Sequence, residues 1–371
     1  MIPLFKVNMP ASVIPHVESV LMSGFIADGD KVQEFEKSLA SYIGNPNVVS
    51  VNSEASGMML ALYLAGVGPG DIVIASPVAC TASTMPILNL FAKVVWSDVN
   101  PISGMLDPVK LESIIRQKEK IKAIIHTHWG GDVGEIERIN EIAKKYNIMV
   151  IDDATEAFGA KYREKHLGAL DSDFVVYSFG PIKHFSTTDG GAIFFKNQQL
   201  MEQARNLKRF GIDRATFRDN LGEISISSDI PKAGYNFYMN NVCASIGINQ
   251  LQNIESILNI YYRNGRIYQS RLMNTSGIEI LERNSFMQPS YWVFTLLADR
   301  RDDLLKALRS RGIYASKIHL RNDMYSCYGT GLQESLIGVK YFSEHDLCIP
   351  CGWWVTEDDA NKIVESIKMG W

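Results

Sequence analysis

The chain has 371 residues, a net charge of −4 with its histidines neutral, 46% hydrophobic residues and 21% charged residues. This length can bury a large core and predicts two subdomains. The weakly acidic balance gives no sign of a nucleic-acid partner, and since no apolar run is long enough to span a bilayer, no membrane partner is expected either.

Cysteine usage indicates the compartment. The five cysteines are odd in number and thinly spread, which favours a reducing cytoplasm over a disulfide framework. The first residues also lack the charged-then-apolar layout of a signal peptide. Cys348 and Cys351 have the spacing of a zinc or redox pair, but zinc would need a second ligand pair that the sequence does not supply. We therefore expect a cytoplasmic protein without a metal.

Short β-branched runs alternate with helical patterns over residues 47–200. Several runs are apolar nearly throughout, as strands covered on both faces are. The alternation predicts an α/β fold with a large, mostly parallel seven-stranded sheet flanked by helices, in which ligands bind beyond the carboxyl ends of the strands. The expected strands cover residues 48–52, 72–76, 93–98, 123–128, 149–153, 174–179 and 192–196, and expected helices cover 109–118 and 136–146.

The pattern changes after residue 234. Residues 242–268 are predicted to form one long helix with an apolar stripe. We expect a large domain at residues 1–250 and a smaller C-terminal α/β domain at residues 251–371, packed as one body because no flexible linker separates them. The C-terminal part is expected to contain a strand at 291–296, a helix at 302–311, a loop at 316–328 and a closing helix at 358–368.

Two strand ends in the large domain carry the chemistry. One strand ends at Asp153, and another ends near Ser178 and is followed by Lys183 and by the diglycine Gly190-Gly191. A strand-end acid followed by a strand-end lysine suggests a site for pyridoxal 5′-phosphate (PLP). The acid would pair with the pyridinium nitrogen, and the lysine would hold the aldehyde as a Schiff base.

Together these segments resemble the sugar aminotransferases of the DegT/DnrJ/EryC1 family, within the fold-type I PLP enzymes, and the resemblance covers nearly the whole chain. In the family's S-F-x-x-x-K…G-G pattern the lysine carries the cofactor, which makes Lys183 the expected catalytic residue. The (E/D)-D-A-x-(Q/E)-A pattern places the nitrogen partner second, and so implies Asp153 rather than Asp152. The same pattern puts Glu156 near the ring hydroxyl.

The resemblance also implies how the phosphate of PLP is held. The family's N-S-G-T-x-A-L turn matches the residues from position 52, with Ala55 and Ser56 at the phosphate-binding positions. Ser178 matches the serine that completes the phosphate site. Asn236 matches the asparagine of the G-x-N-x-R-M loop, which in the family reaches the phosphate of the neighbouring subunit. A homodimer with composite active sites is therefore expected.

Several positions depart from the family's patterns. Glu54 replaces the usual glycine of the phosphate turn, and Ala55 replaces the usual threonine. Thr81 stands where many relatives place an aromatic residue over the cofactor ring, so its expected contact with the cofactor is thinner. Tyr238 replaces the arginine of the Asn236 loop. His128 matches a family histidine beside the site and is expected to support the cofactor.

The substrate side rests on fewer residues. His319 and Arg321 lie in the C-terminal loop, where related enzymes touch substrate. Arg321 could bind an acidic or phosphorylated group with its guanidinium fork, or it could form a salt bridge with Asp323. His184, next to Lys183, is expected to face the sugar.

The resemblance implies a PLP-dependent aminotransferase that moves an amino group from an amino acid, L-glutamate by family expectation, to a keto or aldehydo sugar. The sugar is expected to be nucleotide-linked and the product to feed surface glycan synthesis. A free higher-sugar acid such as an octulosonate is the competing substrate. The chain could also be a PLP-dependent sugar dehydratase, which would lack the lysine, or an idle PLP-fold binding protein. The Lys183–Asp153 pair argues against both of these functions.

Overall fold

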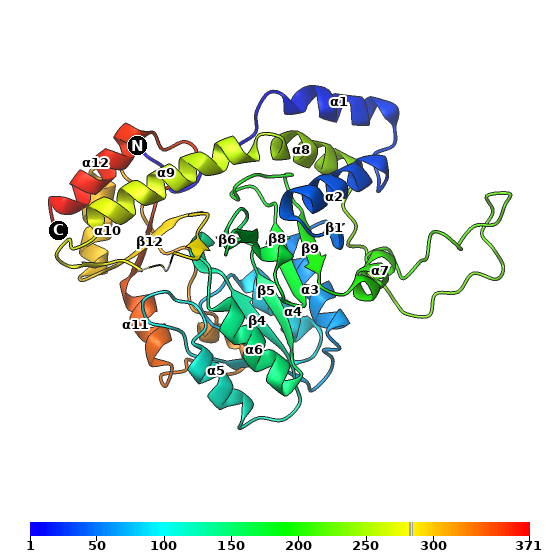
Figure 1. The fold of residues 1–371 in the computed structure, drawn as a ribbon, viewed down its shortest axis with the longest axis horizontal. Helices are drawn as coiled ribbons and strands as arrows, with labels where there is room; N and C mark the ends of the chain where they lie inside the picture. Colours follow the sequence, from blue (N-terminus) through cyan, green and yellow to red (C-terminus); the bar gives the residue numbers. More distant parts are fainter. Residues whose placement is uncertain (282, 284) are drawn as a thin grey trace.

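The computed structural model describes residues 1–281, 283 and 285–371. A seven-stranded sheet with the order β1-β9-β8-β5-β4-β2-β3 forms its centre (Figure 1). β9 is antiparallel to both of its neighbours and the other pairings are parallel, so the mostly parallel sheet is confirmed, and all seven expected strands belong to it. These strands are β1 (Val48–Val51), β2 (Ile72–Ala75), β3 (Lys93–Trp96), β4 (Ile121–Thr127), β5 (Met149–Asp153), β8 (Phe174–Ser178) and β9 (Gly191–Phe195).

Helices cover both faces of this sheet, and the alternation of side chains along each strand divides the core between them. Val175 and Tyr177 of β8 pack in one cluster with Phe35, whereas Val176 packs on the other face with Met58. The first face carries α2 (Asp30–Ile43), α5 (Pro108–Ile115), α6 (Ile136–Tyr146) and α8 (Asn241–Leu251), and the second carries α3 (Glu54–Leu64), α4 (Thr81–Asn89) and α7 (Gln198–Leu207).

A long helix, α9 (Ile254–Leu272), runs from the large sheet to the C-terminal part (Figure 1). The expectation of one helix over residues 242–268 is wrong, because the backbone leaves the helical region at Asn253, with φ −111° and ψ 9°, and so divides α8 from α9. After α9, the described residues hold the sheet β10-β12-β13 and the helices α10, α11 and α12. These elements are β10 (Ile278–Glu279), β12 (Phe294–Ala298), α10 (Arg301–Ser310), α11 (Ile337–His345), β13 (Asp346–Ile349) and α12 (Glu357–Lys368).

The remaining elements are short or peripheral. They are α1 (Val13–Ser23), a small sheet of β6 (Lys161–Tyr162), β7 (Lys165–His166) and β11 (Met287–Gln288), and the 3₁₀ turns η1 (Trp129–Gly131), η2 (Leu167–Ala169), η3 (Asn322–Met324) and η4 (Ser326–Tyr328).

The large and C-terminal parts share one hydrophobic core, which extends from Phe35 of α2 to Ile367 of α12. The start of the chain also belongs to the C-terminal part in space: Ile2 pairs with Ile313, and its amide donates to the carbonyl oxygen of Gly312 at 2.8 Å. This shared core agrees with the expectation of one packed body. The domain boundary at residue 250 stays a prediction.

A long excursion leaves the large part after α7. Residues 212–234 extend away from the body of the protein (Figure 1). They expose the apolar side chains of Leu221, Ile224, Ile226 and Ile230. No helix in the described part of the chain is both long and apolar enough to cross a membrane.

The register of β9 requires a glycine at its first residue. A Cβ atom on Gly191 would lie 2.8 Å from the carbonyl oxygen of Tyr177 and 3.2 Å from the amide nitrogen of Glu54, and neither backbone atom can move cheaply. We expect Gly191→Ala to lower the free energy of unfolding by about 1–3 kcal/mol. Urea unfolding measures it. The control is Gly180→Ala, whose Cβ would meet Ser178 Oγ at 3.6 Å; equal losses in both variants would contradict the close approach.

Candidate active site

The carboxyl ends of β4 and β5 place Asp153 on the face of the sheet that carries α3 and α4. Asp153 is buried and has three donors on its carboxylate. Thr127 Oγ1 donates to Oδ2 at 3.2 Å, while the amide and hydroxyl of Thr155 donate to Oδ1 at 3.2 and 2.7 Å. These bonds fix the direction of the carboxylate beyond the strand end.

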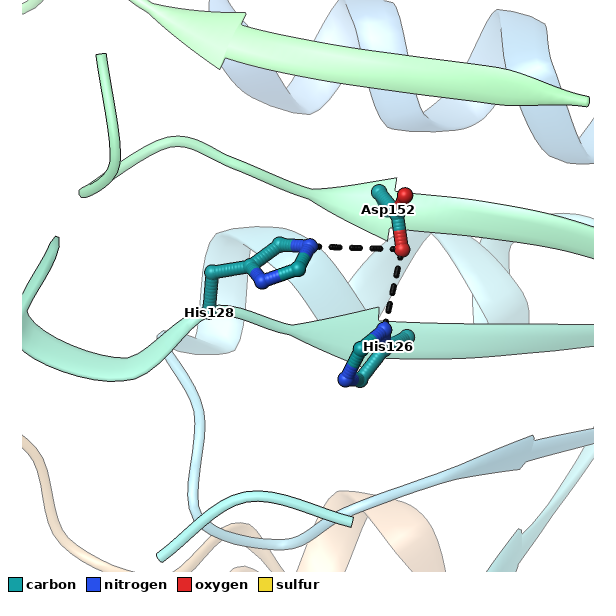
Figure 2. Close-up of side chains that lie close together, drawn as sticks. All are labelled: His126, His128 and Asp152. Carbon is teal, nitrogen blue, oxygen red and sulfur yellow. Dashed lines mark hydrogen bonds and ion pairs between the residues drawn. The ribbon is translucent and has the colours of Figure 1, made fainter. Parts of the chain in front are cut away.

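Asp152 points to the opposite face, as successive residues of a strand do. Its Oδ1 accepts a hydrogen bond from His126 Nδ1 at 3.0 Å and lies 3.3 Å from His128 Nε2 (Figure 2). Burial alone would raise the pKa of Asp152, but the two histidines outweigh it and hold that pKa below its usual range. The expectation that His128 supports the cofactor stays a prediction. Its ring turns back toward Asp152, away from the Asp153 face.

His126, His128 and Asp152 form a buried polar cluster. The three side chains are buried and their ligand atoms lie within 4.8 Å of one another. The amide of Gly134 donates to His128 Nδ1 at 3.2 Å. This bond orients the ring so that Nε2 faces Asp152. His126 Nε2, His128 Nε2 and Asp152 Oδ2 are buried without a hydrogen-bond partner among the described residues.

Lys183 follows β8 in a turn and reaches an aromatic face. Its Nζ lies 4.1 Å from the ring centroid of Trp292, and Trp292 Nε1 donates to the carbonyl oxygen of Ile182 at 2.7 Å. Within the described residues, the ammonium has neither a hydrogen bond nor an ion pair. The Trp292 contact comes from the C-terminal part and was not predicted, because no sequence motif links a residue so distant along the chain to Lys183.

The start of α3 offers amide donors on the same face as Asp153. Ser53 caps the helix, accepting the amide of Ser56 at 3.2 Å. The amides of Glu54 and Ala55 belong to the first turn, whose N–H groups have no partner within the helix. Ser178 ends β8 and pairs in register with Gly191, so it lies beside this helix start. The predicted phosphate residues Ala55, Ser56 and Ser178 are thus brought together.

Glu54 places a buried carboxyl group in this space. Its Oε1 accepts a hydrogen bond from Ser83 Oγ of α4 at 3.1 Å, so the side chain turns away from the helix amides. Burial, together with the charge of Asp153, raises the pKa of Glu54 to about 7, although Lys183 opposes the shift. Burial and Glu54 in turn raise the pKa of Cys80 to about 12. The sequence marked Glu54 as a departure from glycine but did not indicate where its carboxyl group lies.

Glu156 joins the large part to the C-terminal loop. Its Oε2 accepts the amide of Gly130 at 2.8 Å, and its Oε1 is 2.8 Å from His319 Nε2. Burial would raise the pKa of Glu156, but the bond to His319 and the charge of Lys183 outweigh it and lower that pKa. His319 is thus brought to the site, held at Glu156.

Two predicted substrate residues face elsewhere. His184 is buried, its Nε2 lies 3.1 Å from the carbonyl oxygen of Ser290, and burial lowers its pKa to about 4. Arg321 is also buried and makes a bidentate pair with Asp323 at 2.7 and 2.6 Å. His184 packs between the two parts of the protein, and Arg321 forms the salt bridge with Asp323 that was the second of its two expected roles. A substrate contact of either residue stays a prediction.

Two further predicted residues lie at the margins. Thr81 is the first residue of α4, directly after Cys80. Asn236 is exposed, and its backbone carbonyl accepts a hydrogen bond from Asn52 Nδ2 at 3.1 Å. Its side chain is therefore presented at the surface beside the end of β1.

These residues fit PLP. The Lys183 side chain has no hydrogen bond or ion pair within the described residues and, as a neutral amine, could condense with an aldehyde, while Asp153 is an oriented acceptor for a ring nitrogen. The amides at the start of α3 suit a phosphate group because the positive end of a helix dipole lies there. The Glu54 side chain, held by Ser83, leaves those amides free.

The raised pKa of Glu54 predicts a pH-dependent stability of the cofactor-free protein. Between pH 4.5 and about 7 the unfolded chain has released this proton while the folded chain retains it, so stability falls as the pH rises. Glu54→Gln cannot ionise. Its free energy of unfolding should therefore exceed the wild-type value by roughly 2–3 kcal/mol more at pH 8 than at pH 4.

Urea unfolding at the two pH values measures this difference. The exposed Glu119→Gln serves as the control, because it removes a carboxyl group outside the cavity. An advantage of Glu54→Gln that stays constant from pH 4 to pH 8 would contradict the assignment.

Comparisons with known proteins identify the family of this chain. The family model of the DegT/DnrJ/EryC1/StrS aminotransferases matches residues 8–368. The solved sugar aminotransferase CalS13 from Micromonospora echinospora is 33% identical, with a TM-score of 0.93 over 100% of both chains. The UDP-4-amino-4,6-dideoxy-N-acetyl-beta-L-altrosamine transaminase of Campylobacter jejuni is 28% identical over 98% of each chain.

A third relative has a name that concerns a pathway. The spore coat polysaccharide biosynthesis protein SpsC of Bacillus subtilis is 24% identical, over 96% of this chain and 93% of its own. The family match spans nearly the whole sequence, and the structural likeness covers all of it. The protein is therefore a PLP-dependent enzyme of the DegT/DnrJ/EryC1/StrS aminotransferase family.

Proposed function

We propose that this protein transfers an amino group from an amino acid, L-glutamate, to the carbonyl group of a nucleotide-linked keto or aldehydo sugar, in the synthesis of a surface glycan. The observation that carries the proposal is that Lys183 and Asp153 both lie close enough to the buried Glu54 for their charges to affect its pKa. The sugar substrate is supported by the names of the Campylobacter and Bacillus relatives.

Each residue has a role that follows from its surroundings. When bound, PLP supplies an aldehyde that takes up amines and a ring that accepts electrons. Lys183 binds the cofactor and, as a free amine, moves the proton of the amine-bearing carbon at Nζ. Asp153, held by Thr127 and Thr155, accepts a hydrogen bond from the ring nitrogen. Glu156 and His319 border the same space as one linked pair.

We propose that residues of two subunits bind the phosphate of PLP. The start of α3 at Ala55 and Ser56, with Ser178, supplies donors from one chain, and Asn236 of the partner subunit completes the site. Support comes from the exposed side of Asn236 and from the apolar residues on the nearby 212–234 excursion, which a second copy of the chain would cover. The active unit is then an isologous homodimer, and its free cysteines suit the cytoplasm.

The competing functions have less support. A dehydratase lacks the lysine that this chain keeps at position 183. A binding protein without activity would not require Lys183 to be free of ion pairs within the described residues, nor Asp153 to be oriented by Thr127 and Thr155. A free higher-sugar acid as substrate has no support from the relatives' names, which concern a UDP-linked amino sugar and a spore coat polysaccharide.

The proposed reaction is tested with a panel of nucleotide-linked keto and aldehydo sugars. With L-glutamate as donor, we expect 2-oxoglutarate to form only when an accepted sugar is present, beyond one equivalent per site. An octulosonate joins the panel as the competing substrate class. Lys183→Ala should lower turnover by several orders of magnitude because one residue supplies both the nucleophile and the base. Turnover in that variant near the wild-type rate would refute the mechanism.

The lysine assignment has a direct chemical test. Borohydride reduction of the PLP-loaded protein should fix the cofactor covalently, and peptide mass mapping should place the pyridoxyl group on Lys183. Lys208 is a useful internal control, because it is a buried lysine already bonded to Glu36 at 3.1 Å and to the carbonyl oxygen of Ser50 at 3.0 Å. An adduct on any other lysine would contradict the assignment of Lys183 as the cofactor-binding residue.

The composite site is tested by mixing two impaired variants, Lys183→Ala and Asn236→Ala. After subunit exchange, a heterodimer has one site with both residues intact and one with neither. Activity should return toward one working site per heterodimer. Asn236→Ala must first be shown to cost activity alone. Proven exchange without recovery would mean that Asn236 serves its own chain.

A further inference from the structure

Glu54 places a carboxyl group in the helix turn that is proposed to bind the phosphate of PLP. It is the first residue of α3, after the Ser53 cap, and it is followed directly by Ala55 and Ser56. Its side chain is buried. A phosphate group bound at this helix start would share the first turn of α3 with the Glu54 carboxyl group. Little water is present there to screen the repulsion between two anions.

The surroundings of the Glu54 carboxyl group favour its neutral form. Ser83 Oγ of α4, itself buried, donates to Oε1 at 3.1 Å, and Oε2 accepts no hydrogen bond from any described residue. Burial, together with the charge of Asp153, raises the pKa of Glu54 to about 7. Near neutral pH, the carboxyl group of the empty site is therefore partly ionised, and a further negative charge beside it favours the protonated form.

The charged and titratable groups around Glu54 come from several elements. Asp153 at the end of β5 and Glu156 after it add negative charge, whereas Lys183 after β8 opposes them. Cys80, directly before α4, has a pKa raised to about 12 by burial and by Glu54, so its thiol stays neutral below that pH. Among the described residues, no cation forms an ion pair with Glu54. A phosphate dianion adds to the negative side of this balance.

We propose that Glu54 controls cofactor affinity: its carboxyl group is neutral when the phosphate of PLP is bound at the start of α3, and binding takes up a proton where the empty site holds the carboxylate. The proton comes from solvent and binds to Oε2, because Oε1 already accepts a hydrogen bond from Ser83. An ionised Glu54 weakens binding by repulsion. The inference rests on the proposed function only in placing the phosphate at Ala55 and Ser56.

The experiment compares cofactor-free wild-type protein with Glu54→Gln. The ligand is pyridoxamine 5′-phosphate, the cofactor form that makes no covalent bond to Lys183. Quenching of tryptophan fluorescence measures the dissociation constant from pH 5.5 to 8.5. The ratio of the wild-type to the Glu54→Gln dissociation constant should rise about three- to thirtyfold over this range, as expected for one partly screened unit charge. Protonation of the ligand itself cancels in this ratio.

Calorimetry counts the protons. At pH 7.5, titrations in two buffers with different ionisation enthalpies should show that wild type takes up more protons on binding than Glu54→Gln, by a fraction of one per site. Glu54→Ala, which also removes the bond to Ser83, should behave as Glu54→Gln does.

Glu357 offers a matched control. Like Glu54, it is the first residue of a helix, α12, and follows a side-chain cap, Thr356, but it is exposed. Glu357→Gln should follow wild type at every pH in both measurements. Urea unfolding establishes that each variant is folded.

Two outcomes would overturn the inference. A ratio that stays constant from pH 5.5 to 8.5 would mean that the charge of Glu54 does not affect the bound phosphate group. Equal proton uptake in wild type and Glu54→Gln would mean that the carboxyl group keeps one charge state on binding. Both differ from a failure of the proposed function, which would show as absent sugar-dependent turnover or as a pyridoxyl group on a lysine other than Lys183.

Discussion

The alternation of side chains at the end of β5 is the constraint on which the site depends. The side chains of two adjacent aspartates point to opposite faces of the sheet, and each has different neighbouring side chains. Asp152 faces two histidines on the side of the sheet that carries α6, whereas Asp153 lies on the side that carries α3 and α4. Parallel strands end at the same edge of a sheet, so Lys183, which follows β8, lies at the same edge as Asp153, which ends β5.

The charged groups around Lys183 are not paired with it. Asp153, Glu54 and Glu156 are all buried, and each carboxyl group is bonded to neutral donors or to His319 rather than to Lys183. The lysine is left without an anionic partner at bonding distance and rests on an aromatic ring. Such an arrangement leaves the amine accessible for covalent chemistry, since a close salt bridge would have to be broken before each reaction.

Strand patterns in the sequence predicted the sheet well because apolar runs covered on both faces have few other interpretations. Patterns also located Lys183 and Asp153, which stand at fixed positions relative to strand ends. They were less informative about side-chain direction. His128, His184 and Arg321 match or adjoin motifs, yet each turns toward a partner that burial supplies: Asp152, Ser290 and Asp323. A contact such as that of Trp292 depends on tertiary packing, which no local pattern encodes.

The pairing of Ile2 with Ile313 has a consequence for the order of assembly. The first residues of the chain can take their place only when a segment more than three hundred residues later has been made, so their contacts are among the most non-local in the protein. Phe5, which stacks on Trp292, belongs to the same early segment. A nascent chain can therefore complete the large sheet well before the wall beside Lys183 exists. We expect the surroundings of Lys183 to form last, when the C-terminal part packs against the large part and pairs with the N-terminal residues.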